Sequence, residues 1–207
     1  MSYRVIDDYY RRQHFDFFKS FEVPFYTITF NLDVTAVKEL SRDRGYPIYL
    51  TQCYLFARGM GRVEDFRYRV IDDQIVLFDH LDIAATLPAP DGAFSFAQFD
   101  HDPDLKGFLR RAESVSQRAR KAATLEATGE SNAILFTSLP GVRFTGFTHA
   151  TPSDRSDGRA RVAFGQFFED CGRLMVPVGL GVNHIFIDGA AIGKLVEEVQ
   201  TEFDNPG

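Results

Sequence analysis

The segment Asn183-His184-Ile185-Phe186-Ile187-Asp188-Gly189 holds the residues of this chain that are best placed to do chemistry. An apolar stretch over residues 174–182 precedes it and predicts a buried strand, and the pattern after Gly189 predicts a helix. A strand that ends at an imidazole, followed by an acid and a glycine that permits a sharp turn, is one way to fix a general base. Histidine suits that role because it titrates near working pH.

Both residues also have ordinary structural explanations. A single histidine in a folded protein is more often a satisfied core residue than a catalyst, and an aspartate at the start of a helix is a good N-cap. Asp188 cannot contact the imidazole of His184 along a strand, but across a strand–turn–helix junction it can brace the turn. Capping and bracing are compatible, so both interpretations of Asp188 stay open.

Other site chemistries lack their sequence signatures. The five histidines show no metal-binding pair at i, i+4 with a third ligand, so no metal is expected. There is no Gly-x-Ser-x-Gly elbow of a serine hydrolase, no Gly-x-Gly-x-x-Gly and no phosphate-binding loop ending in Gly-Lys-Ser/Thr. A base without its own nucleophile remains. It suits direct transfer, in which an acceptor hydroxyl is deprotonated and attacks an activated acyl group.

The elements that must position this base alternate between strands and helices. Asp72-Asp73, between residues 66–70 and 74–78, predicts a tight hairpin. Further strands are predicted over residues 23–32, 81–87, 133–137, 143–147, 161–168 and 173–182. Helices are predicted over residues 8–20, 33–44, 49–63, 103–123 and from 188 or 189 onward. We expect an α/β fold, a two-layer sandwich with a mixed β-sheet packed on one side by helices.

Composition bounds the class of protein. The chain has 207 residues, is 44% hydrophobic and fits a single domain over residues 1–207. Its net charge of −6 makes nucleic acid an unexpected partner. No apolar run approaches the ~20 residues that span a bilayer, and the N-terminus lacks a signal-peptide core. We therefore expect a soluble, cytoplasmic protein with no membrane partner.

An ordered set of motifs resembles the type A chloramphenicol acetyltransferases. The block from Leu174 through Asp188-Gly189 carries the resemblance most strongly, although His-x-x-x-Asp-Gly also occurs in dihydrolipoyl acyltransferases and peptide-synthetase condensation domains. The matching motifs span nearly the whole chain: Arg11-Arg12-Gln13-His14-Phe15, Phe25-Tyr26-Thr27, Leu32-Asp33-Val34-Thr35, Phe66-Arg67-Tyr68-Arg69, Asp72-Asp73, Phe94-Ser95 and Ser138-Leu139-Pro140.

The resemblance implies roles for individual residues. His184 would be the general base that deprotonates the acceptor as it attacks the thioester of acetyl-CoA, and Thr137 would hydrogen-bond the oxyanion. Asp188 and Arg11 would form a buried structural ion pair, whose loss typically costs about 3–5 kcal/mol. The remaining correspondences are Tyr26, Phe30 and Phe94 in the acceptor pocket and Phe167 on the coenzyme adenine.

The same resemblance implies a homotrimer with active sites between subunits and acetylation of chloramphenicol, which inactivates the antibiotic. The chain departs from the family at Asn183, Thr137, Gly141 and Ala163, and over the short region 123–132. These changes concentrate on the acceptor side. The alternatives are therefore a family member that acetylates another hydroxyl compound, a catalytically weak homologue that binds small molecules or CoA, and a stand-alone relative of the dihydrolipoyl acyltransferase core.

Overall fold

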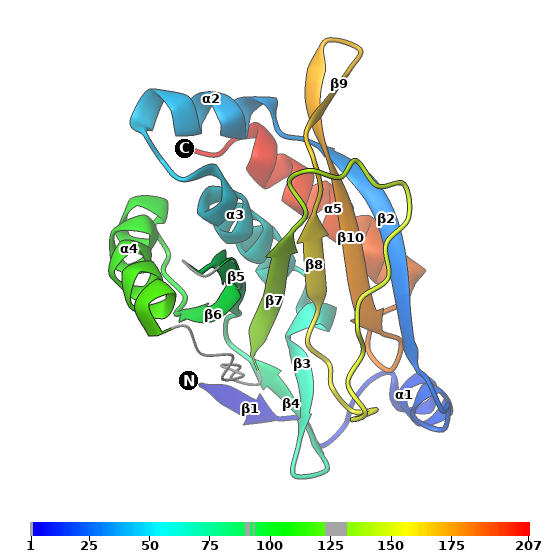
Figure 1. Cartoon of the computed structure of the whole chain (residues 1–207). Coiled ribbons are helices and arrows are strands. Elements are labelled where there is room, and N and C mark those ends of the chain that lie inside the picture. The colour runs from blue at the N-terminus through cyan, green and yellow to red at the C-terminus, as the bar shows by residue number, and fades with distance from the viewer. Residues whose placement is uncertain (1, 90–91, 93, 123–131) are drawn as a thin grey trace.

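The computed structural model describes residues 2–89, 92, 94–122 and 132–207. Its centre is a seven-stranded mixed sheet in the order β2-β10-β8-β7-β5-β6, with β9 paired to β10 (Figure 1). The strands are β2 (Phe25–Asp33), β5 (Asp82–Pro88), β6 (Phe94–Phe99), β7 (Ala133–Ser138), β8 (Arg161–Phe164), β9 (Phe168–Asp170) and β10 (Arg173–Asn183). β7 runs parallel to β5 and β8, and the other pairs are antiparallel.

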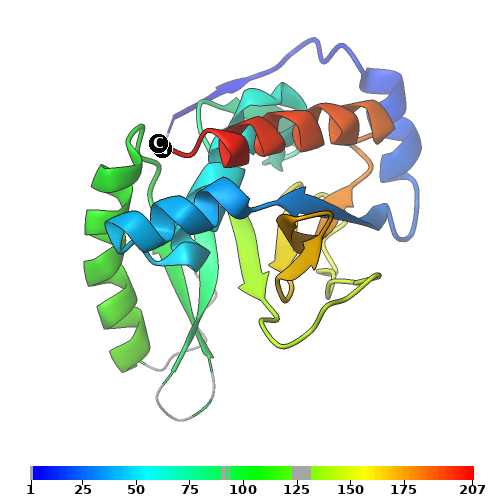
Figure 2. The same ribbon diagram turned by 90° about the horizontal axis from the view of Figure 1, so that it is seen from above.

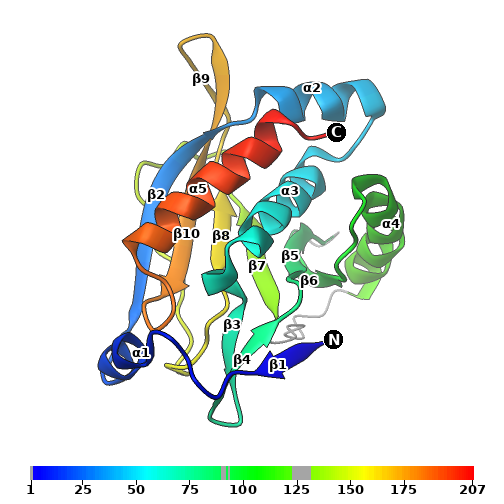
Figure 3. The same ribbon diagram turned by 180° about the vertical axis from the view of Figure 1, so that it is seen from behind.

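Helices pack on one face of this sheet. They are α2 (Thr35–Arg44), α3 (Ile48–Arg62), α4 (Leu105–Ala122) and α5 (Gly189–Asp204), with a short 3-10 helix η1 (Glu64–Arg67), whereas α1 (Arg12–Lys19) lies at the end of the sheet beside the start of β2. Seen from behind, α3 and α5 cross the sheet while α4 lies beside its β5–β6 end (Figure 3). The predicted α/β sandwich with a mixed sheet is confirmed. None of the helices that the structure describes has an apolar stretch long enough to cross a membrane.

The core lies between α3, α5 and the sheet. The buried apolar stripe of α5 consists of Ile192, Leu195, Val199 and Phe203, which share one face of the helix. Gly59 of α3 faces Val199 so closely that an added Cβ would lie 2.8 Å from the Val199 Cα. The missing side chain at Gly59 therefore allows the two helices to pack in direct contact.

A smaller three-stranded sheet lies beside the main one (Figure 1). It has the order β1-β4-β3, formed by β1 (Tyr3–Val5), β4 (Gln74–Phe78) and β3 (Tyr68–Ile71). The predicted hairpin is present, and its turn residues Asp72 and Asp73 have positive φ values of 49° and 60°. Such a left-handed turn matches the twist of the two strands. Phe66, which was predicted to lie in the first strand, belongs to η1 instead.

The face of the main sheet opposite the helices is partly covered by the segment between β7 and β8 (Figure 2). The predicted strand over residues 143–147 is wrong, because this stretch joins no β-ladder. Its aromatic residues pack over glycines of the sheet instead: Phe144 lies against Gly165, and Phe147 against Gly179. The aromatic residues that suggested a strand therefore cover part of the sheet face opposite the helices.

The predicted strand over residues 161–168 is also wrong as one element. β8 ends at Phe164, and β9 begins at Phe168. Between them Gly165 donates its backbone N–H to the carbonyl of Pro177 on β10. Because proline has no N–H to return, the ladder is interrupted at this point.

Candidate active site

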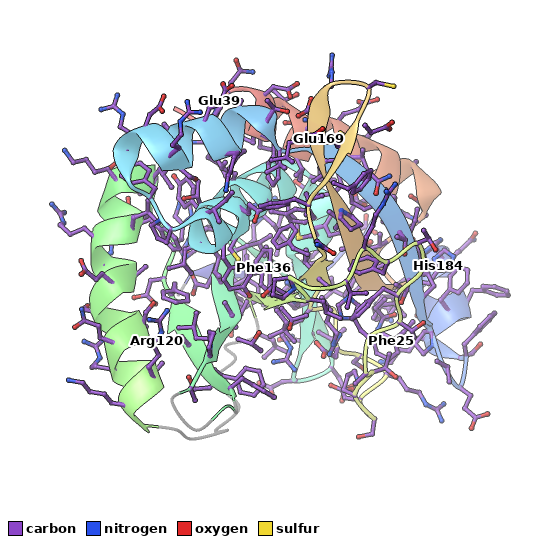
Figure 4. The ribbon with its side chains drawn as sticks, turned by 45° about the horizontal axis from the view of Figure 1, so that its top comes forward. Phe25, Glu39, Arg120, Phe136, Glu169 and His184 are labelled. Carbon is purple, nitrogen blue, oxygen red and sulfur yellow. The ribbon has the colours of Figure 1, made fainter. Side chains whose placement is uncertain are left out.

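His184 directly follows the last residue of β10, at the end of the sheet beside α1 (Figure 4). Its backbone N–H donates to the Pro24 carbonyl at 2.8 Å, which holds the turn to the start of β2. The Phe18 ring of α1 stacks on the imidazole, with centroids 3.7 Å apart and planes at 16°. Tyr26 of β2 packs against the imidazole at 4.9 Å. Two aromatic rings from different elements therefore fix its orientation.

His14 supports the backbone of His184. Its Nε2 lies 2.6 Å from the His184 carbonyl oxygen, while its Nδ1 lies 3.3 Å from Nη2 of Arg11. These contacts fit a neutral His14 that donates from Nε2 and accepts at Nδ1. Burial lowers the pKa of His14, and it outweighs the hydrogen bond to the His184 carbonyl, which acts in the opposite direction. The lowered pKa favours the same neutral form. His184 Nδ1 is buried without a hydrogen-bond partner among the described residues.

Arg11 connects the start of α1 to the turn after His184. Its Nη2 donates to Asp188 Oδ2 at 2.8 Å, and its Nη1 donates to Asp65 Oδ1 at 3.1 Å. Nη1 also reaches the Phe186 carbonyl at 3.3 Å. The Arg11 and Asp188 side chains are 16% and 35% exposed, so the pair is only partly buried. Its loss should therefore cost less than the loss of the fully buried pair that the sequence suggested.

Asp188 both caps a helix and braces the turn. Its Oδ1 accepts the Ala191 N–H at 2.9 Å as the N-cap of α5, while Oδ2 pairs with Arg11. Burial opposes ionisation of the carboxyl, but the N–H of Ala191 and the charge of Arg11 outweigh it and lower the pKa of Asp188. The two interpretations that the sequence left open thus coexist in the structure.

Tyr26 ties β2 to the same turn. Its hydroxyl donates to the Ile187 carbonyl at 3.3 Å. Burial, reinforced by the nearby Asp188 carboxylate, raises the pKa of Tyr26 to about 12. The hydroxyl therefore stays protonated and available as a donor near neutral pH.

Three residues of this cluster were not predicted from the sequence to have a role: His14, Phe18 and Asp65. Arg11, His14 and Phe18 are spaced by three and four positions, which places them on one face of a helix. From this spacing, His14 and Phe18 could have been predicted to lie beside Arg11 at the site. Asp65 carried no such signal, because only the tertiary fold brings η1 to Arg11.

Thr137 lies elsewhere on the same sheet. It pairs with Ala163 on β8, which pairs with Gly179 on β10. His184 follows Gly179 by roughly 16 Å along the chain direction, at about 3.3 Å per strand residue. In Figure 4, Phe136, the neighbour of Thr137 in sequence, lies near the middle of the molecule and His184 lies at its margin. One chain thus does not bring Thr137 to His184.

Of the four aromatic residues assigned to binding, Tyr26 lies beside His184 and the other three are dispersed. Phe30 on β2 pairs with Val178 and borders a cavity of about 150 Å³ with Arg143 and Phe168. Phe94 begins β6 and is 47% exposed. Phe167 lies between β8 and β9, and Lys38 Nζ of α2 lies 6.0 Å from its ring centroid.

The departures from the family pattern have different surroundings. Asn183 is buried and donates from Nδ2 to the carbonyls of Arg155 and Asp157, so it holds the covering segment to the end of β10. Gly141 lies in open space. Residues 123–131 of the short region lie outside the described residues.

His184 is a partly exposed imidazole in this cluster, held by ring stacking and by hydrogen bonds to its backbone. Such a group can take a proton from a hydroxyl that binds beside it. Among the described residues, no group of three His, Cys, Asp or Glu side chains is placed to hold a metal ion.

Comparison with known proteins gives a consistent result. The family model described as chloramphenicol acetyltransferase matches residues 1–200. The chain is 29% identical to the chloramphenicol acetyltransferase of Streptomyces acrimycini, over 97% of this chain and 93% of the relative. It is 23% identical to chloramphenicol acetyltransferase 3 of Escherichia coli, over 97% and 96% of the two chains.

Solved structures show the same fold. A chloramphenicol acetyltransferase structure superposes with a TM-score of 0.90 at 23% identity, covering 97% of this chain and 99% of that one. A probable dihydrolipoamide acetyltransferase from Listeria monocytogenes reaches 0.66 at 15% identity, covering 94% and 89%. Since the family model covers almost the whole sequence, the chain is an acyltransferase that belongs to the chloramphenicol acetyltransferase family.

Proposed function

We propose that the protein transfers an acetyl group from acetyl-CoA directly to a hydroxyl of chloramphenicol, with His184 as the general base. The observation that carries the proposal is the fixation of one partly exposed imidazole by Phe18, Tyr26 and the His14 contact to its carbonyl. Positioning of this kind is worth most to a proton-transfer group.

The proton and the acyl group move in a balanced sequence. The imidazole of His184 takes the proton of the acceptor hydroxyl while that oxygen attacks the thioester carbonyl. The tetrahedral intermediate then collapses with cleavage of the C–S bond, and the imidazolium returns the proton to the CoA thiolate. No covalent enzyme intermediate forms, which agrees with the absence of a nucleophile elbow from the sequence.

Arg11 and Asp188 act on this step through the turn. Their ion pair and the α5 cap hold the segment that leads away from His184. They orient the imidazole without exchanging its proton. They are therefore positioning residues.

We assign the oxyanion to the Thr137 hydroxyl of a second copy of the chain. Thr137 lies too far from His184 of the same chain to share one tetrahedral centre with it. A cyclic homotrimer would place the His184 end of one subunit against the Thr137 face of the next and repeat this contact three times.

Two surface features favour such an assembly. β2 is a nine-residue strand at the edge of the described sheet, and His184 lies beside its first residue, bonded to the carbonyl of Pro24. Around α1, Phe17, Phe21 and Val23 are 59%, 41% and 63% exposed, which is unusual for a surface that meets only water. A neighbouring subunit would cover both.

Both substrates need apolar contacts, and we assign Tyr26, Phe30 and Phe94 to the acceptor and Phe167 to the adenine of acetyl-CoA. Lys38, beside Phe167, places a cation where a phosphorylated coenzyme would lie. The proposal includes a single domain over residues 1–207, a cytoplasmic location where acetyl-CoA is available, no metal, and inactivation of the antibiotic as the consequence.

One observation favours a second candidate, acetylation of a different hydroxyl compound. His149 lies over Gly181 on the sheet face that carries Thr137, and it bonds the Gly179 carbonyl at 3.0 Å. An imidazole there makes this face more polar than an aliphatic residue would, which would change the preferred acceptor. The third candidate is a weak homologue that binds small molecules or CoA without useful turnover.

Product analysis separates these candidates. Purified protein is incubated with acetyl-CoA and either chloramphenicol or a panel of other hydroxyl compounds, and each acceptor is examined by mass spectrometry. A gain of one acetyl group on chloramphenicol supports the main proposal. Acetylation of another acceptor alone supports the second candidate, and CoA binding without any acetylated product supports the third.

A further inference from the structure

Thr86 on β5 lies next to Thr137 on β7. The two strands are parallel and in register, with Ala85 paired to Phe136. The residues that follow this pair, Thr86 and Thr137, bring their hydroxyl oxygens to 3.1 Å, with Thr86 as donor. No other side chain is hydrogen-bonded to Thr137 in the part of the chain that the structure describes.

The two threonines share one face of the sheet. Phe136 and Ala85 belong to the core beneath the helices. Because side chains alternate along a strand, Thr137 and Thr86 project from the opposite face. Both are partly exposed, so a ligand on that face can reach the Thr137 hydroxyl while Thr86 supports it from the side.

A hydroxyl has one proton to donate and two lone pairs to accept with. When Thr86 donates to a lone pair of Thr137, the proton of Thr137 is not consumed by its neighbour. It remains free for an oxygen on the sheet face. The bond also polarises the Thr137 hydroxyl, since hydrogen bonds in a chain strengthen one another.

Tyr49 of α3 lies near Thr86, and its buried hydroxyl has no hydrogen-bond partner among the described residues. Burial raises the pKa of its phenol strongly, and the neighbouring Thr86 hydroxyl acts in the opposite direction. The phenol of Tyr49 therefore remains protonated at working pH.

We propose that Thr86 is a positioning residue for the transferase reaction, donating to Thr137 so that the Thr137 proton points at the oxyanion. This inference rests on the proposed function, in which Thr137 stabilises that oxyanion. It accounts for threonine at position 137: the methyl group restricts the side-chain rotamer, and the Thr86 bond selects the hydroxyl direction.

The test compares two substitutions of matched shape. Thr86→Val keeps the volume and removes the hydroxyl, whereas Thr86→Ser keeps the hydroxyl and removes the methyl. We expect Thr86→Val to lower kcat about three- to tenfold, as for loss of one neutral hydrogen bond, with unchanged KM for both substrates. Thr86→Ser should retain most of the wild-type kcat. Thermal unfolding of both variants serves as the control for folding. A merely structural role of Thr86 would lower the melting temperature without a lowered kcat at unchanged KM.

A double-mutant cycle locates the effect at Thr137. Thr86→Val should lower kcat in the wild type but have no further effect once Thr137→Val has removed the hydroxyl. If Thr137→Val lowers kcat but Thr86→Val leaves it unchanged, the role of Thr86 is refuted while the proposed function stands. If Thr137→Val itself retains wild-type kcat, the oxyanion assignment in the proposed function fails. Additive losses would also overturn the role of Thr86, because they would place its action outside the Thr137 hydroxyl.

Discussion

Thr137 and His184 lie on one sheet, yet the strand register keeps them apart. Thr137 shares a row with Ala163 and Gly179, whereas His184 lies beyond the end of β10. The separation follows from ladder geometry, so side-chain motion cannot close it. The proposed base and the proposed oxyanion donor would therefore have to come from two copies of the chain.

Mixed oligomers should therefore recover activity from two inactive variants. His184→Ala removes the base and leaves Thr137 intact, while Thr137→Val does the reverse. When the two variants are coexpressed with different tags and the doubly tagged species is isolated, one of the three sites in each mixed cyclic trimer should be restored, about a third of the sites. The measurement is the rate of CoA release by the doubly tagged species.

Each variant alone serves as a control and should be nearly inactive, because removal of an oxyanion donor typically costs about 100- to 1,000-fold. A mixture of wild type and His184→Ala shows that mixed oligomers remain competent. If verified mixed oligomers of the two variants stay inactive while this control is active, the shared site is refuted.

Substitutions of Asp188 should separate its cap from its charge. Asp188→Asn keeps an oxygen for the Ala191 N–H but loses the Arg11 pair, so unfolding should become easier by about 1–2 kcal/mol at neutral pH. Asp188→Ala loses both and should cost about 1 kcal/mol more. Urea unfolding gives these free energies, and kcat should fall with them because the turn that carries His184 loosens.

The stabilisation that the ionised Asp188 carboxylate provides depends on pH. Because the folded-state pKa of Asp188 is lowered from 3.8, its contribution is present above that value and is lost as the pH falls through the lowered folded pKa. The difference in free energy of unfolding between wild type and Asp188→Asn should therefore become smaller at acidic pH. Arg11→Ala with wild-type stability and wild-type rate would contradict the bracing role of the pair.

Stability should also fall as the pH drops below about 6.5. Burial lowers the pKa values of His14, His101 and His149 from 6.5 in the folded protein. The unfolded chain then binds more protons than the folded one below 6.5, so protonation favours unfolding and stability rises as the pH increases through this range. Denaturant midpoints at pH 7.5 and 5.5 measure the effect, and His149→Gln should reduce the difference. An unchanged difference in His149→Gln would exclude His149 as a source.

Two glycines should respond oppositely to alanine. A Cβ at Gly181 would lie 2.9 Å from the His149 ring, whereas at Gly193 in α5 nothing lies within 4 Å. Gly181→Ala should destabilise the protein by about 1–3 kcal/mol through overpacking. Gly193→Ala should stabilise it by about 0.4–1 kcal/mol by restricting the unfolded chain. Thermal unfolding of both variants checks the pair, and equal shifts would show that His149 does not pack on β10 in solution.

Local patterns predicted the site's scaffold well. The apolar run before His184, the acid at Asp188 and the periodic helix after it became β10, the N-cap and α5. These features depend on neighbours in sequence, where strand and helix periods and cap chemistry act directly. The Asp72-Asp73 turn was predictable for the same reason.

Features that depend on tertiary packing were not predictable. Residues 143–147 have strand-like composition, but their aromatic side chains pack against glycines of the main sheet region. This packing depends on residues distant in sequence, so the local pattern could not predict it. The stack of Phe18 on His184 and the contact of Asp65 with Arg11 join segments far apart in sequence. The distance between Thr137 and His184 required the strand order, which motif spacing does not contain.

The most direct test of His184 as the general base is the initial rate of thiol release from acetyl-CoA in the presence of chloramphenicol. Wild type, His184→Ala and His80→Gln are compared, the last controlling for loss of a histidine away from the site. We predict release by wild type and His80→Gln, and a rate at least about 100-fold lower for folded His184→Ala. Release by His184→Ala at the wild-type rate would contradict the account.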